Sequence, residues 1–431
     1  MAMSQKFDAI IVGAGPAGCA CGYRLAQAGL EVLVVERGNF AGAKNMWGGA
    51  FFGPTLGELL ADFWEQAPIE RYVARHRLSL LCDEDSLSIE FTTPKFSQRP
   101  YNGFTVLRSR FDRWFATKVQ EAGAIVASGL AADDILWDGT KVVGIKAGGD
   151  ELPADVVIAC DGVNSALAQK AGLRGELKPQ EVKQGVKEVI TLPRETIEQR
   201  FNLTGDEGVA WTFVGSCTQG LPGGGFIYTN KDSLSVGLVV QLNALIDKQV
   251  RANDLLEGFK QSPTVARLLE GGKLAEYSAH LIPVEGINMM PRLYTNGFLV
   301  AGDAAALVVG TGLILEGANF AVASGVAAAE TVIRAKGKED FSANSLAYYQ
   351  ELLEQSFVLK DLKTYKEAPH FLENPRIYNI YPELACNLAE KLFTSDGQPR
   401  KRAWQLLRET MKDKVSLQQL ARDLMRGRKA V

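Results

Sequence analysis

The feature that most constrains the fold of this chain is the segment 7–38, FDAIIVGAGPAGCACGYRLAQAGLEVLVVERG. An apolar β-type run, a glycine-rich turn, a helical stretch and a second apolar run follow one another, which is the order of a βαβ unit. Gly13 permits the tight turn, Gly15 lets the backbone approach a pyrophosphate, and Gly18 lets the helix pack closely on the sheet. The segment therefore predicts a dinucleotide-binding cradle with the phosphates at the helix N-terminus.

A carboxylate ends the second strand of this unit. Glu36 follows Gly18 by 18 residues, where it can accept hydrogen bonds from both ribose hydroxyls and would repel a 2′-phosphate. This position favours FAD or NAD over NADP. Arg37 is a candidate for contact with the adenine or a phosphate, although an arginine beside a strand end is as often simply solvated.

Two later segments favour FAD over NAD. The strings DVVIACDG (155–162) and GFLVAGD (297–303) each read as a buried strand that ends in an acidic residue beside glycine. Both are expected to return to the first sheet, and cofactors bind beyond the carboxyl ends of such strands. An Asp-Gly pair alone could merely make a turn. Together with the cradle, the segments predict that four residues gather around one long ligand: Asp161, Gly162, Gly302 and Asp303.

Composition excludes several other classes of protein. The chain has 431 residues, of which 46% are hydrophobic and 23% charged, with a net charge of -3. These values are typical of a globular chain of two or three domains without affinity for nucleic acid. Six scattered cysteines and three histidines form no metal-ligand or nucleophile pattern, so we expect no metal and assign no catalytic side chain. The short polar N-terminus predicts a cytoplasmic protein without a signal peptide.

Three segments resemble the fingerprints of the flavoprotein superfamily typified by aromatic hydroxylases and geranylgeranyl reductases. They are Gly13 to Gly18, Cys160 to Gly162 and Gly302 to Asp303. The resemblance implies that Asp303 holds the ribityl or pyrophosphate region of FAD. It also implies that Arg108, in VLRSRFDRWF, is an FAD-binding arginine, and that Gly312 and Leu313 form the turn whose backbone amides meet the pyrimidine edge of the flavin. Such a helix N-terminus would stabilise an anionic reduced flavin.

A glycine-rich loop, GAKNMWGG (42–49), is expected to pass the flavin ring. Gly49 and Lys44 are therefore candidate cofactor-binding residues. A cation or amide from Lys44 or Asn45 could stabilise the reduced flavin, and a solvated loop is an equally good interpretation.

Further strings narrow the resemblance to one branch of the superfamily. QGVKEVITLP (184–193), GGGFIYTNKDSLSVGLV (223–239), EYSAHLIPVEGINMMP (276–291) and FLENPRIYNIYPELA (371–385) look like the FixC branch of the electron transfer flavoprotein:quinone oxidoreductases. Longer members of that family end in a ferredoxin-like domain with a [4Fe-4S] cluster, which this chain lacks. The FixC branch places that function on a separate small protein.

The resemblance implies an FAD-containing electron-transfer subunit. Its expected partners are the alpha and beta subunits of an electron transfer flavoprotein, a quinone, a small ferredoxin-like iron-sulfur protein and the cytoplasmic membrane surface, to which it would bind peripherally. In the bifurcating versions of such complexes, a companion route reduces ferredoxin or flavodoxin, and this chain would lie on the quinone-directed branch.

The predicted fold class is α/β, with an FAD-binding Rossmann-like three-layer domain, an inserted antiparallel β-sheet domain and a helical C-terminal region. Strands are expected at 185–192, 209–214, 224–230 and 234–240, and two short ones at 75–91. Phe226 and Tyr228 would share a face of their strand. The predicted domains are residues 1–74 with 100–165 and 285–335 for FAD, 75–99 with 166–284 for the substrate side, and 336–431 for the helical region.

Two segments carry features of a lipid or quinone surface. The apolar run 304–315 is too short to span a membrane. It is either the quinone-binding surface, with Leu307, Val308, Val309, Leu313 and Ile314 as candidates, or a buried helix and strand edge. From Arg400 onward there are 10 Lys or Arg and 3 Asp or Glu, a charge of +7 that could meet anionic lipid or an acidic partner, or be a solvated tail.

Two other functions fit the same fold. One is an FAD-dependent prenyl-lipid reductase or NAD(P)H-dependent hydroxylase. Geranylgeranyl reductases typically carry an aromatic-rich Y-x-W-x-F-P string where this chain has FIYTNKD, which counts against the reductase. The other is a non-catalytic, flavin-bound assembly subunit. His280 could line the flavin or quinone pocket or be a structural histidine, and it is not assigned a catalytic role.

Overall fold

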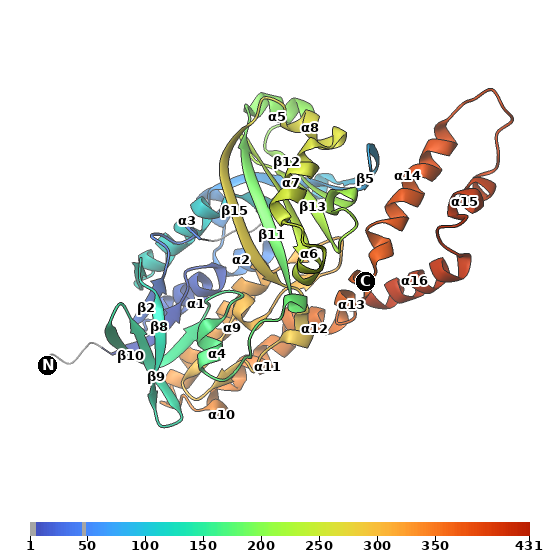
Figure 1. Cartoon of the computed structure of the whole chain (residues 1–431). Coiled ribbons are helices and arrows are strands. Elements are labelled where there is room, and N and C mark those ends of the chain that lie inside the picture. The colour runs from blue at the N-terminus through green and yellow to red at the C-terminus, as the bar shows by residue number, and fades with distance from the viewer. Residues whose placement is uncertain (1–5, 45–48) are drawn as a thin grey trace.

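The structure is a computed structural model, and it describes residues 6–44 and 49–431. Two β-sheets lie side by side, and a set of C-terminal helices extends from them (Figure 1). No helix within the described ranges is long and apolar enough to cross a membrane.

The main path of the first sheet has the strand order β16-β17-β10-β1-β2-β7, and on this path all strands except the edge strand β16 run parallel. The strands are β1 (Phe7–Val12), β2 (Val32–Glu36), β7 (Ile125–Ser128), β10 (Asp150–Ala159), β16 (Tyr294–Thr295) and β17 (Phe298–Val300). Because β1, β10 and β17 are covered on both faces, they read as continuous apolar runs. The predicted return of segments 155–162 and 297–303 to this sheet is confirmed, since β10 pairs with β1 and β17 pairs with β10.

A β-hairpin pairs with the N-terminal part of β10 and adds two strands to the sheet. It consists of β8 (Ala132–Asp138) and β9 (Lys141–Ala147), and β9 pairs antiparallel with β10. Three helices pack around the parallel strands: α1 (Pro16–Gln27), α3 (Arg108–Glu121) and α9 (Ala318–Lys336). The contact between α1 and α9 is close because Gly325 faces the backbone of α1. A Cβ atom on Gly325 would lie 2.2 Å from the carbonyl oxygen of Ala17.

The second sheet has the order β15-β11-β14-β13-β12-β4-β6-β3, and β5 pairs with β4. Its strands are β3 (Ala50–Phe52), β4 (Ile69–Cys82), β5 (Asp85–Thr92), β6 (Gly103–Val106), β11 (Val182–Thr191), β12 (Glu207–Gly215), β13 (Gly223–Thr229), β14 (Ser233–Gln241) and β15 (Lys273–Pro283). The four strands predicted within 185–240 are confirmed. The sheet is not wholly antiparallel, because β12 pairs with β4 in parallel.

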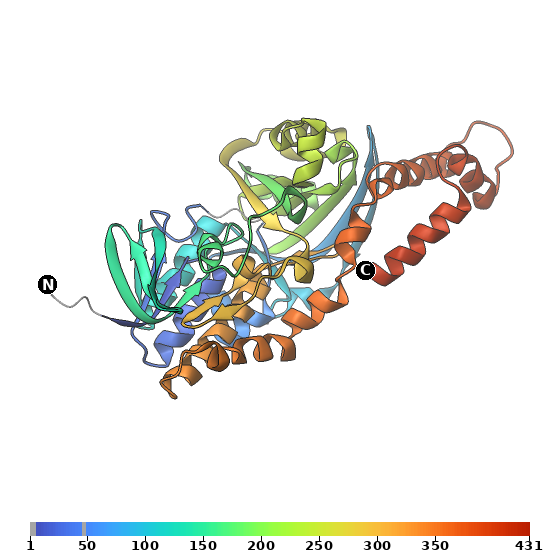
Figure 2. The same ribbon diagram turned by 60° about the horizontal axis from the view of Figure 1, so that its bottom comes forward.

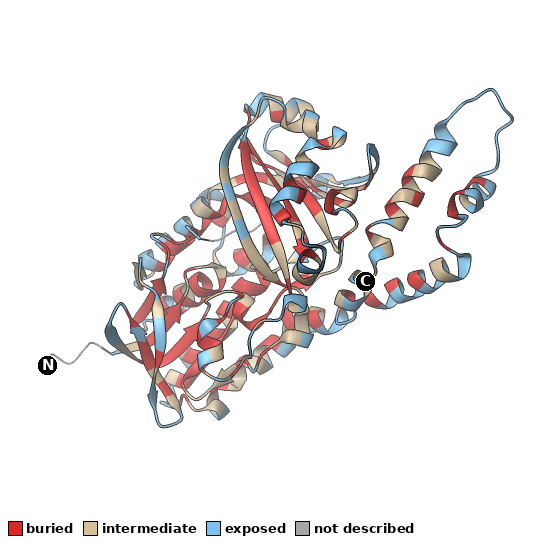
Figure 3. Ribbon diagram, viewed as in Figure 1, coloured by how far each residue is buried: buried red, intermediate tan, exposed pale blue. Residues whose placement is uncertain are grey.

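Four short helices lie against this sheet: α5 (Arg194–Phe201), α6 (Leu242–Lys248), α7 (Ala252–Gln261) and α8 (Pro263–Leu269). α7 contacts β11 and β14 and encloses a second apolar core, centred on Phe213 and Phe259. Most residues of β11 and β14 are buried, whereas the edge strand β15 has mostly exposed and intermediate residues (Figure 3).

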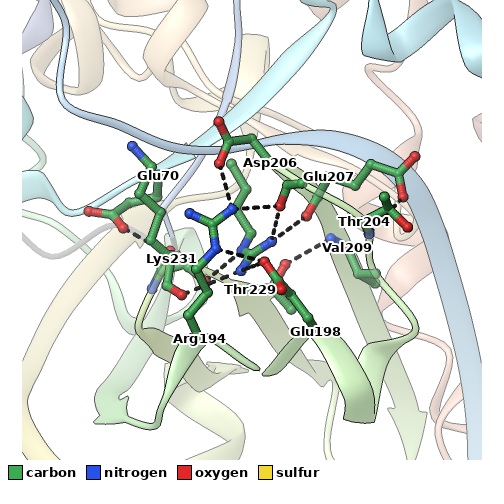
Figure 4. Close-up of polar contacts among 12 residues, drawn as sticks. Glu70, Arg194, Glu198, Thr204, Asp206, Glu207, Val209, Thr229 and Lys231 are labelled. Atoms are coloured by element: carbon green, nitrogen blue, oxygen red, sulfur yellow. Dashed lines mark hydrogen bonds and ion pairs between the residues drawn. The ribbon is translucent and has the colours of Figure 1, made fainter. Parts of the chain in front are cut away.

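The sheet is joined at one end by the side chain of Arg71, which is 0% exposed. Arg71 donates hydrogen bonds to the carbonyl oxygens of Gly205, Glu207 and Asn230, at 3.0, 2.9 and 2.7 Å, and reaches the Glu198 carboxylate at 3.3 Å. Figure 4 shows how carboxylates from α5 and from the turn before β12 gather there with Arg194. One guanidinium therefore connects β4 with two turns distant in sequence.

Two segments differ from what their sequences predict. The strands at 75–91 are not short, because β4 runs for 14 residues, from Ile69 to Cys82. The run 304–315 contains no α-helix, only the end of a 3₁₀ turn at Gly302–Ala305 and the two-residue strands β18 (Val309–Gly310) and β19 (Leu315–Glu316). Residues 304–309 are buried in the core, while Leu313, at 64% exposure, is not.

The C-terminal region is helical, as the sequence predicts. It contains α10 (Ala343–Leu346), α11 (Tyr348–Gln355), α12 (Phe357–Thr364), α13 (Ala368–Leu372), α14 (Ile380–Phe393), α15 (Ala403–Met411) and α16 (Leu417–Ala430). α11 and α12 pack on α9, whereas α14, α15 and α16 form an arm that projects from the body in both views (Figures 1 and 2). The arm has its own small core of Leu384, Met411 and Val415.

α14 packs on β4 and β5 of the body, and Asp423 joins α16 to the start of the arm. The carboxylate of Asp423 accepts hydrogen bonds from Arg376 at 2.7 and 2.9 Å and from the Tyr381 hydroxyl. These donors hold the pKa of Asp423 well below its ordinary value.

Candidate functional site

A cavity of about 840 Å³ lies between the carboxyl ends of the parallel strands and one face of the second sheet. The phosphate cradle lines one end, and residues of α13, α14 and the C-terminus line the other. Pockets of this size hold small ligands and cofactors.

The cradle depends on glycine at two points. Gly13 has a φ of +105°, and a Cβ atom there would lie 2.3 Å from the carbonyl oxygen of Cys160. A Cβ atom on Gly18 would lie 1.8 Å from the carbonyl oxygen of Gly13. The turn therefore packs against β10 and starts α1 with its free N–H groups at the cavity, where Gly13 and Gly15 line the wall.

Glu36 lies beside the cradle with its carboxylate already oriented. It accepts hydrogen bonds from the backbone N–H of Ala14 at 3.0 Å and of Gly38 at 2.7 Å. The side chain is buried and lines the cavity, while the neighbouring Arg37 is exposed and also lines it. Fixed in this way, Glu36 keeps lone pairs available for ligand hydroxyls.

Asp161 and Gly162 follow β10 at the same edge. The Asp161 Oδ2 accepts a hydrogen bond from the Leu167 N–H at 3.0 Å, whereas its buried Oδ1 has no partner among the described residues. Burial raises the pKa of Asp161. A buried polar atom without a partner at a cavity wall indicates a polar ligand group.

Asp303 and Arg108 approach the cavity from different elements. Asp303 follows β17 within the turn Gly302–Ala305; burial raises the pKa of its carboxyl, while Arg108 acts in the opposite direction. Arg108 is the first residue of α3, is buried, and pairs with Asp112 through Nε at 2.7 Å. Both side chains line the cavity.

The turn after β18 and the loop before β3 form another part of the wall. Gly312 has a φ of +86° and lines the cavity with Leu313 and Ile314. Lys44 is exposed and lines the cavity, and Asn45 lies outside the described residues.

Three of the predicted glycines allow other parts of the chain to pack closely behind the cavity wall. Besides Gly18, a Cβ on Gly49 would lie 2.8 Å from the Val106 carbonyl oxygen, and one on Gly302 would lie 2.9 Å from the Ala17 Cβ. Among the quinone candidates of the run 304–315, Leu307 and Val309 are buried away from the cavity, whereas Val308 lines it.

One face of the second sheet forms the opposite wall. The register places side chains from neighbouring strands next to one another on this face. Those that line the cavity are mostly apolar: Leu78 and Leu80 of β4, Ala210, Thr212 and Val214 of β12, Phe226 and Tyr228 of β13, Val239 of β14 and Ile282 of β15. The prediction that Phe226 and Tyr228 share a face is confirmed, because their rings stack with centroids 4.9 Å apart.

Two histidines also lie on this face. Burial lowers the pKa of His76, and burial with the charges of Arg108 and Arg37 lowers the pKa of His280 to about 4. Both imidazoles are therefore neutral at neutral pH. His280 lines the cavity, which supports the first of the two interpretations of this residue.

Sequence reasoning missed the far end of the cavity. Residues that line it there include Lys183, Gln241, Glu285, Glu373, Tyr378 and Val431. No sequence signal singled out Lys183, because its strand also carries the charges of Lys187 and Glu188. The other residues come from separate segments that only the fold brings together.

Comparison with protein families gives three matches. Residues 8–95 match the family "FAD dependent oxidoreductase", residues 183–282 match "ETF-QO, ubiquinone-binding", and residues 368–431 match the "ETF-QO/FixC family C-terminal domain". The first range contains the cradle, and the other two contain most of the far end of the cavity.

Relatives match along almost the entire chain. A probable electron transfer flavoprotein-quinone oxidoreductase, YdiS of Escherichia coli K12, is 43% identical over 427 residues, with 99% of both chains covered. Protein FixC of the same strain is 44% identical, with 98% of both chains covered. Protein FixC of Azorhizobium caulinodans is 41% identical, with 92% of both chains covered.

Solved structures agree on the fold. A geranylgeranyl bacteriochlorophyll reductase-like protein from Thermoplasma acidophilum matches with a TM-score of 0.74 at 19% identity, over 98% of this chain and 99% of the other. The flavin-dependent brominase Bmp2 matches with a TM-score of 0.64 at 17% identity, over 95% of this chain and 99% of the other. These matches confirm the predicted fold class, and the sequence relatives show that the chain is an FAD-dependent oxidoreductase that belongs to the FixC and electron transfer flavoprotein-quinone oxidoreductase family.

Proposed function

We propose that this chain accepts electrons from the alpha and beta subunits of an electron transfer flavoprotein and passes them through FAD to a quinone. One observation carries the proposal: a single cavity joins the dinucleotide cradle to an apolar sheet face and to the C-terminal segment. A two-electron carrier and an apolar acceptor could therefore lie in contact within one enclosed space.

The residues around the first part of the cavity fit FAD. The amides after Gly13 face the pyrophosphate, Glu36 accepts hydrogen bonds from the adenosine ribose, and the unpartnered Oδ1 of Asp161 accepts one from the ligand. Asp303 and Arg108 hold the ribityl and pyrophosphate region. When bound, the flavin supplies the exchange of one or two electrons.

Five further residues line the proposed FAD site. The turn of Gly312 and Leu313 presents its backbone to the pyrimidine edge, Lys44 places a positive charge near the reduced ring, and Arg37 and Gly162 line the cradle end. Gly18, Gly49 and Gly302 act indirectly, by permitting the close backbone packing that holds this wall in place.

The quinone would bind at the apolar end of the cavity. Leu313, Ile314 and Leu315 are exposed large hydrophobic residues that also line the cavity, so they form an apolar entrance. A quinone with a prenyl tail requires such a route, because its ring must reach the flavin while its tail stays in lipid.

The projecting arm supports peripheral attachment to the cytoplasmic membrane surface. Phe393, Trp404, Leu424 and Met425 are exposed apolar side chains on the arm, among the ten cations that follow residue 399. Apolar and basic side chains together favour binding to anionic lipid.

The remaining parts of the proposal concern the complex. A small ferredoxin-like iron-sulfur protein would supply the cluster, since the six cysteines of this chain are scattered without a cluster-binding spacing. In a bifurcating complex this chain would lie on the quinone-directed branch.

An anaerobic experiment on the purified flavoprotein tests the proposed function. NADH or NADPH is added first and flavin bleaching is followed by absorbance, and then the flavin is photoreduced and mixed with a short-chain quinone. We expect no bleaching by either nucleotide and rapid reoxidation by quinone.

Bleaching by pyridine nucleotide with slow reoxidation would instead support the hydroxylase or prenyl-lipid reductase. A flavin that never changes redox state in the assembled complex would support the non-catalytic assembly subunit. Each result contradicts the relay between flavoprotein and quinone.

A further inference from the structure

An unpaired lysine lies at the far end of the cavity. Lys183 is on β11, opposite Gln241 of β14 and Ile282 of β15, so its side chain lies on the face of the sheet that lines the cavity. The other charged side chains of β11 are paired: Lys187 with Glu276 at 3.6 Å and Glu188 with Lys260 at 2.8 Å. Among the described residues, no hydrogen bond or ion pair holds Lys183.

The surroundings of Lys183 bring its titration close to neutral pH. Burial lowers the pKa of Lys183 to about 8, and the negative charge of Glu285 only partly opposes this effect. An amine with such a pKa can donate a proton and recover one within each turnover. Buried groups with shifted pKa values beside a cavity are typical of functional sites.

Glu285 connects Lys183 to a second group. It follows β15, where the N–H of Val284 donates a hydrogen bond to the Glu181 carbonyl oxygen at 3.0 Å. The carboxyl of Glu285 lines the cavity and is half-buried. Burial raises its pKa; Glu373 and Glu181 raise it further, and His370 and Lys183 lower it.

His370 and Glu373, which both affect the pKa of Glu285, lie at the surface. His370 and Glu373 lie one helical turn apart, with 3.9 Å between Nδ1 and Oε2, and each side chain is more than half exposed. Glu373 also lines the cavity. Lys183, Glu285 and Glu373 therefore line one cavity, and the charges of Lys183, Glu373 and the exposed His370 all act on Glu285.

The other polar groups at this end are poor proton donors. His280, with its pKa lowered to about 4, is neutral, and Gln241 does not titrate. Burial raises the pKa of Tyr378, and it raises the pKa of Tyr381 to about 12, where the hydroxyl already donates to Asp423.

We propose that Lys183 is the catalytic proton donor to the quinone oxygen, and that Glu285 returns protons to it from solvent by way of Glu373 and His370. This inference rests on the proposed function. Reduction of a quinone to a hydroquinone takes two electrons, which the proposed reaction delivers, and two protons. A reduced flavin gives up one proton with its two electrons, so one further proton is needed. For that proton an N–H bond of the Lys183 ammonium breaks and an O–H bond forms on the quinone. The amine then takes a proton from the Glu285 carboxyl, which solvent restores.

The test compares two acceptors that differ only in their need for protons. Photoreduced flavoprotein is mixed anaerobically with a short-chain quinone, which needs protons, or with ferricyanide, which needs none, and flavin reoxidation is followed between pH 6 and pH 10. For K183M we expect quinone reoxidation to slow about 100-fold at pH 7, with ferricyanide reoxidation and flavin absorbance unchanged. K178M, at an exposed lysine just before β11, is the matched control and should behave as wild type.

Three further results are expected. Wild-type quinone reoxidation falls as pH rises through about 8, because the ammonium is lost, and it slows in D₂O. K183M loses both dependences, and added methylamine partly restores its rate. E285Q retains the donor but slows its recovery, so the pH profile shifts while quinone affinity, measured by flavin fluorescence quenching, does not.

Unchanged quinone rates and pH profiles in K183M would overturn the proposal. If K183M does not fold, the wild-type profile still decides, because quinone and ferricyanide rates with the same pH dependence would also overturn it. Failure of the proposed function looks different, since the wild-type flavin would then react slowly with quinone at every pH and would be bleached by NADH or NADPH.

Discussion

At the scale of single residues, the cradle depends on which glycines face backbone and which face open space. Gly13 and Gly29 both have a positive φ, +105° and +81°. A Cβ atom on Gly13 would meet the Cys160 carbonyl oxygen, whereas one on Gly29, at the end of α1, would meet nothing within 4 Å. The two positions therefore separate the cost of an unfavourable φ from the cost of a steric clash.

The first prediction concerns these two glycines. G13A should purify mostly without flavin, because the added methyl group must displace β10 from the turn in addition to about 1–2 kcal/mol of backbone strain. G29A should keep most of its FAD, since it meets only the strain. The flavin-to-protein absorbance ratio measures both, and equal ratios in the two variants would contradict the steric explanation.

The second prediction concerns pH and His280. Its pKa in the folded protein, about 4, lies below its ordinary 6.5, so between these values the unfolded chain binds more protons than the folded one. Stability therefore rises with pH across this window and is lost as pH falls. Because the imidazole is only partly buried, we expect a loss of about 1 kcal/mol from pH 7 to pH 5. Urea unfolding of wild type and H280Q measures it, and an equal loss in H280Q would assign the effect to other groups.

At the scale of elements, the structure joins strands and turns through contacts distant in sequence. Arg71 of β4 reaches the turn before β12 and the turn after β13, including Asn230. These bonds go mainly to backbone carbonyl oxygens, and that of Asn230 is buried and would otherwise lack this donor. The arginine is therefore expected to contribute to stability rather than to chemistry.

The third prediction follows from this network. R71M should lower the free energy of unfolding by about 3 kcal/mol, because one buried and several part-buried acceptors lose their shared donor. R194M removes a half-exposed arginine from the same cluster and should cost less than about 1 kcal/mol. Denaturant unfolding compares the two, and similar losses would show that burial of Arg71 is not the decisive factor.

The sequence alone predicts the strands that are apolar along their whole length. The strands of the cradle, β10 and β17 were predictable because two-sided burial requires continuous apolar runs. The run 304–315 was not, since its composition suits a helix while Gly310, Gly312 and the sheet contacts of Val309 hold it extended. The far end of the cavity was hidden because Lys183, Glu285 and Glu373 meet only through the tertiary fold.

At the scale of the whole molecule, the arm extends the protein well beyond its two sheets (Figure 2). α16 turns Asp423, Gly427 and Ala430 inward and leaves Leu424, Met425 and its cations exposed. The same arm begins next to the far end of the cavity, through Tyr378 and Tyr381. A surface that meets lipid would therefore lie close to the place where an apolar substrate enters.

The fourth prediction tests this arrangement with lipid vesicles. Wild type should sediment with anionic vesicles and far less with neutral ones, and added salt should weaken the binding because exposed charges are screened. The double variant R426E and K429E should bind anionic vesicles at least about tenfold more weakly, since each basic side chain near the surface contributes about 1 kcal/mol. The variant K248E and K363E makes the same charge change at exposed lysines of α6 and α12 and should bind as wild type. Equal weakening in both double variants would show that net charge, and not the arm, controls attachment.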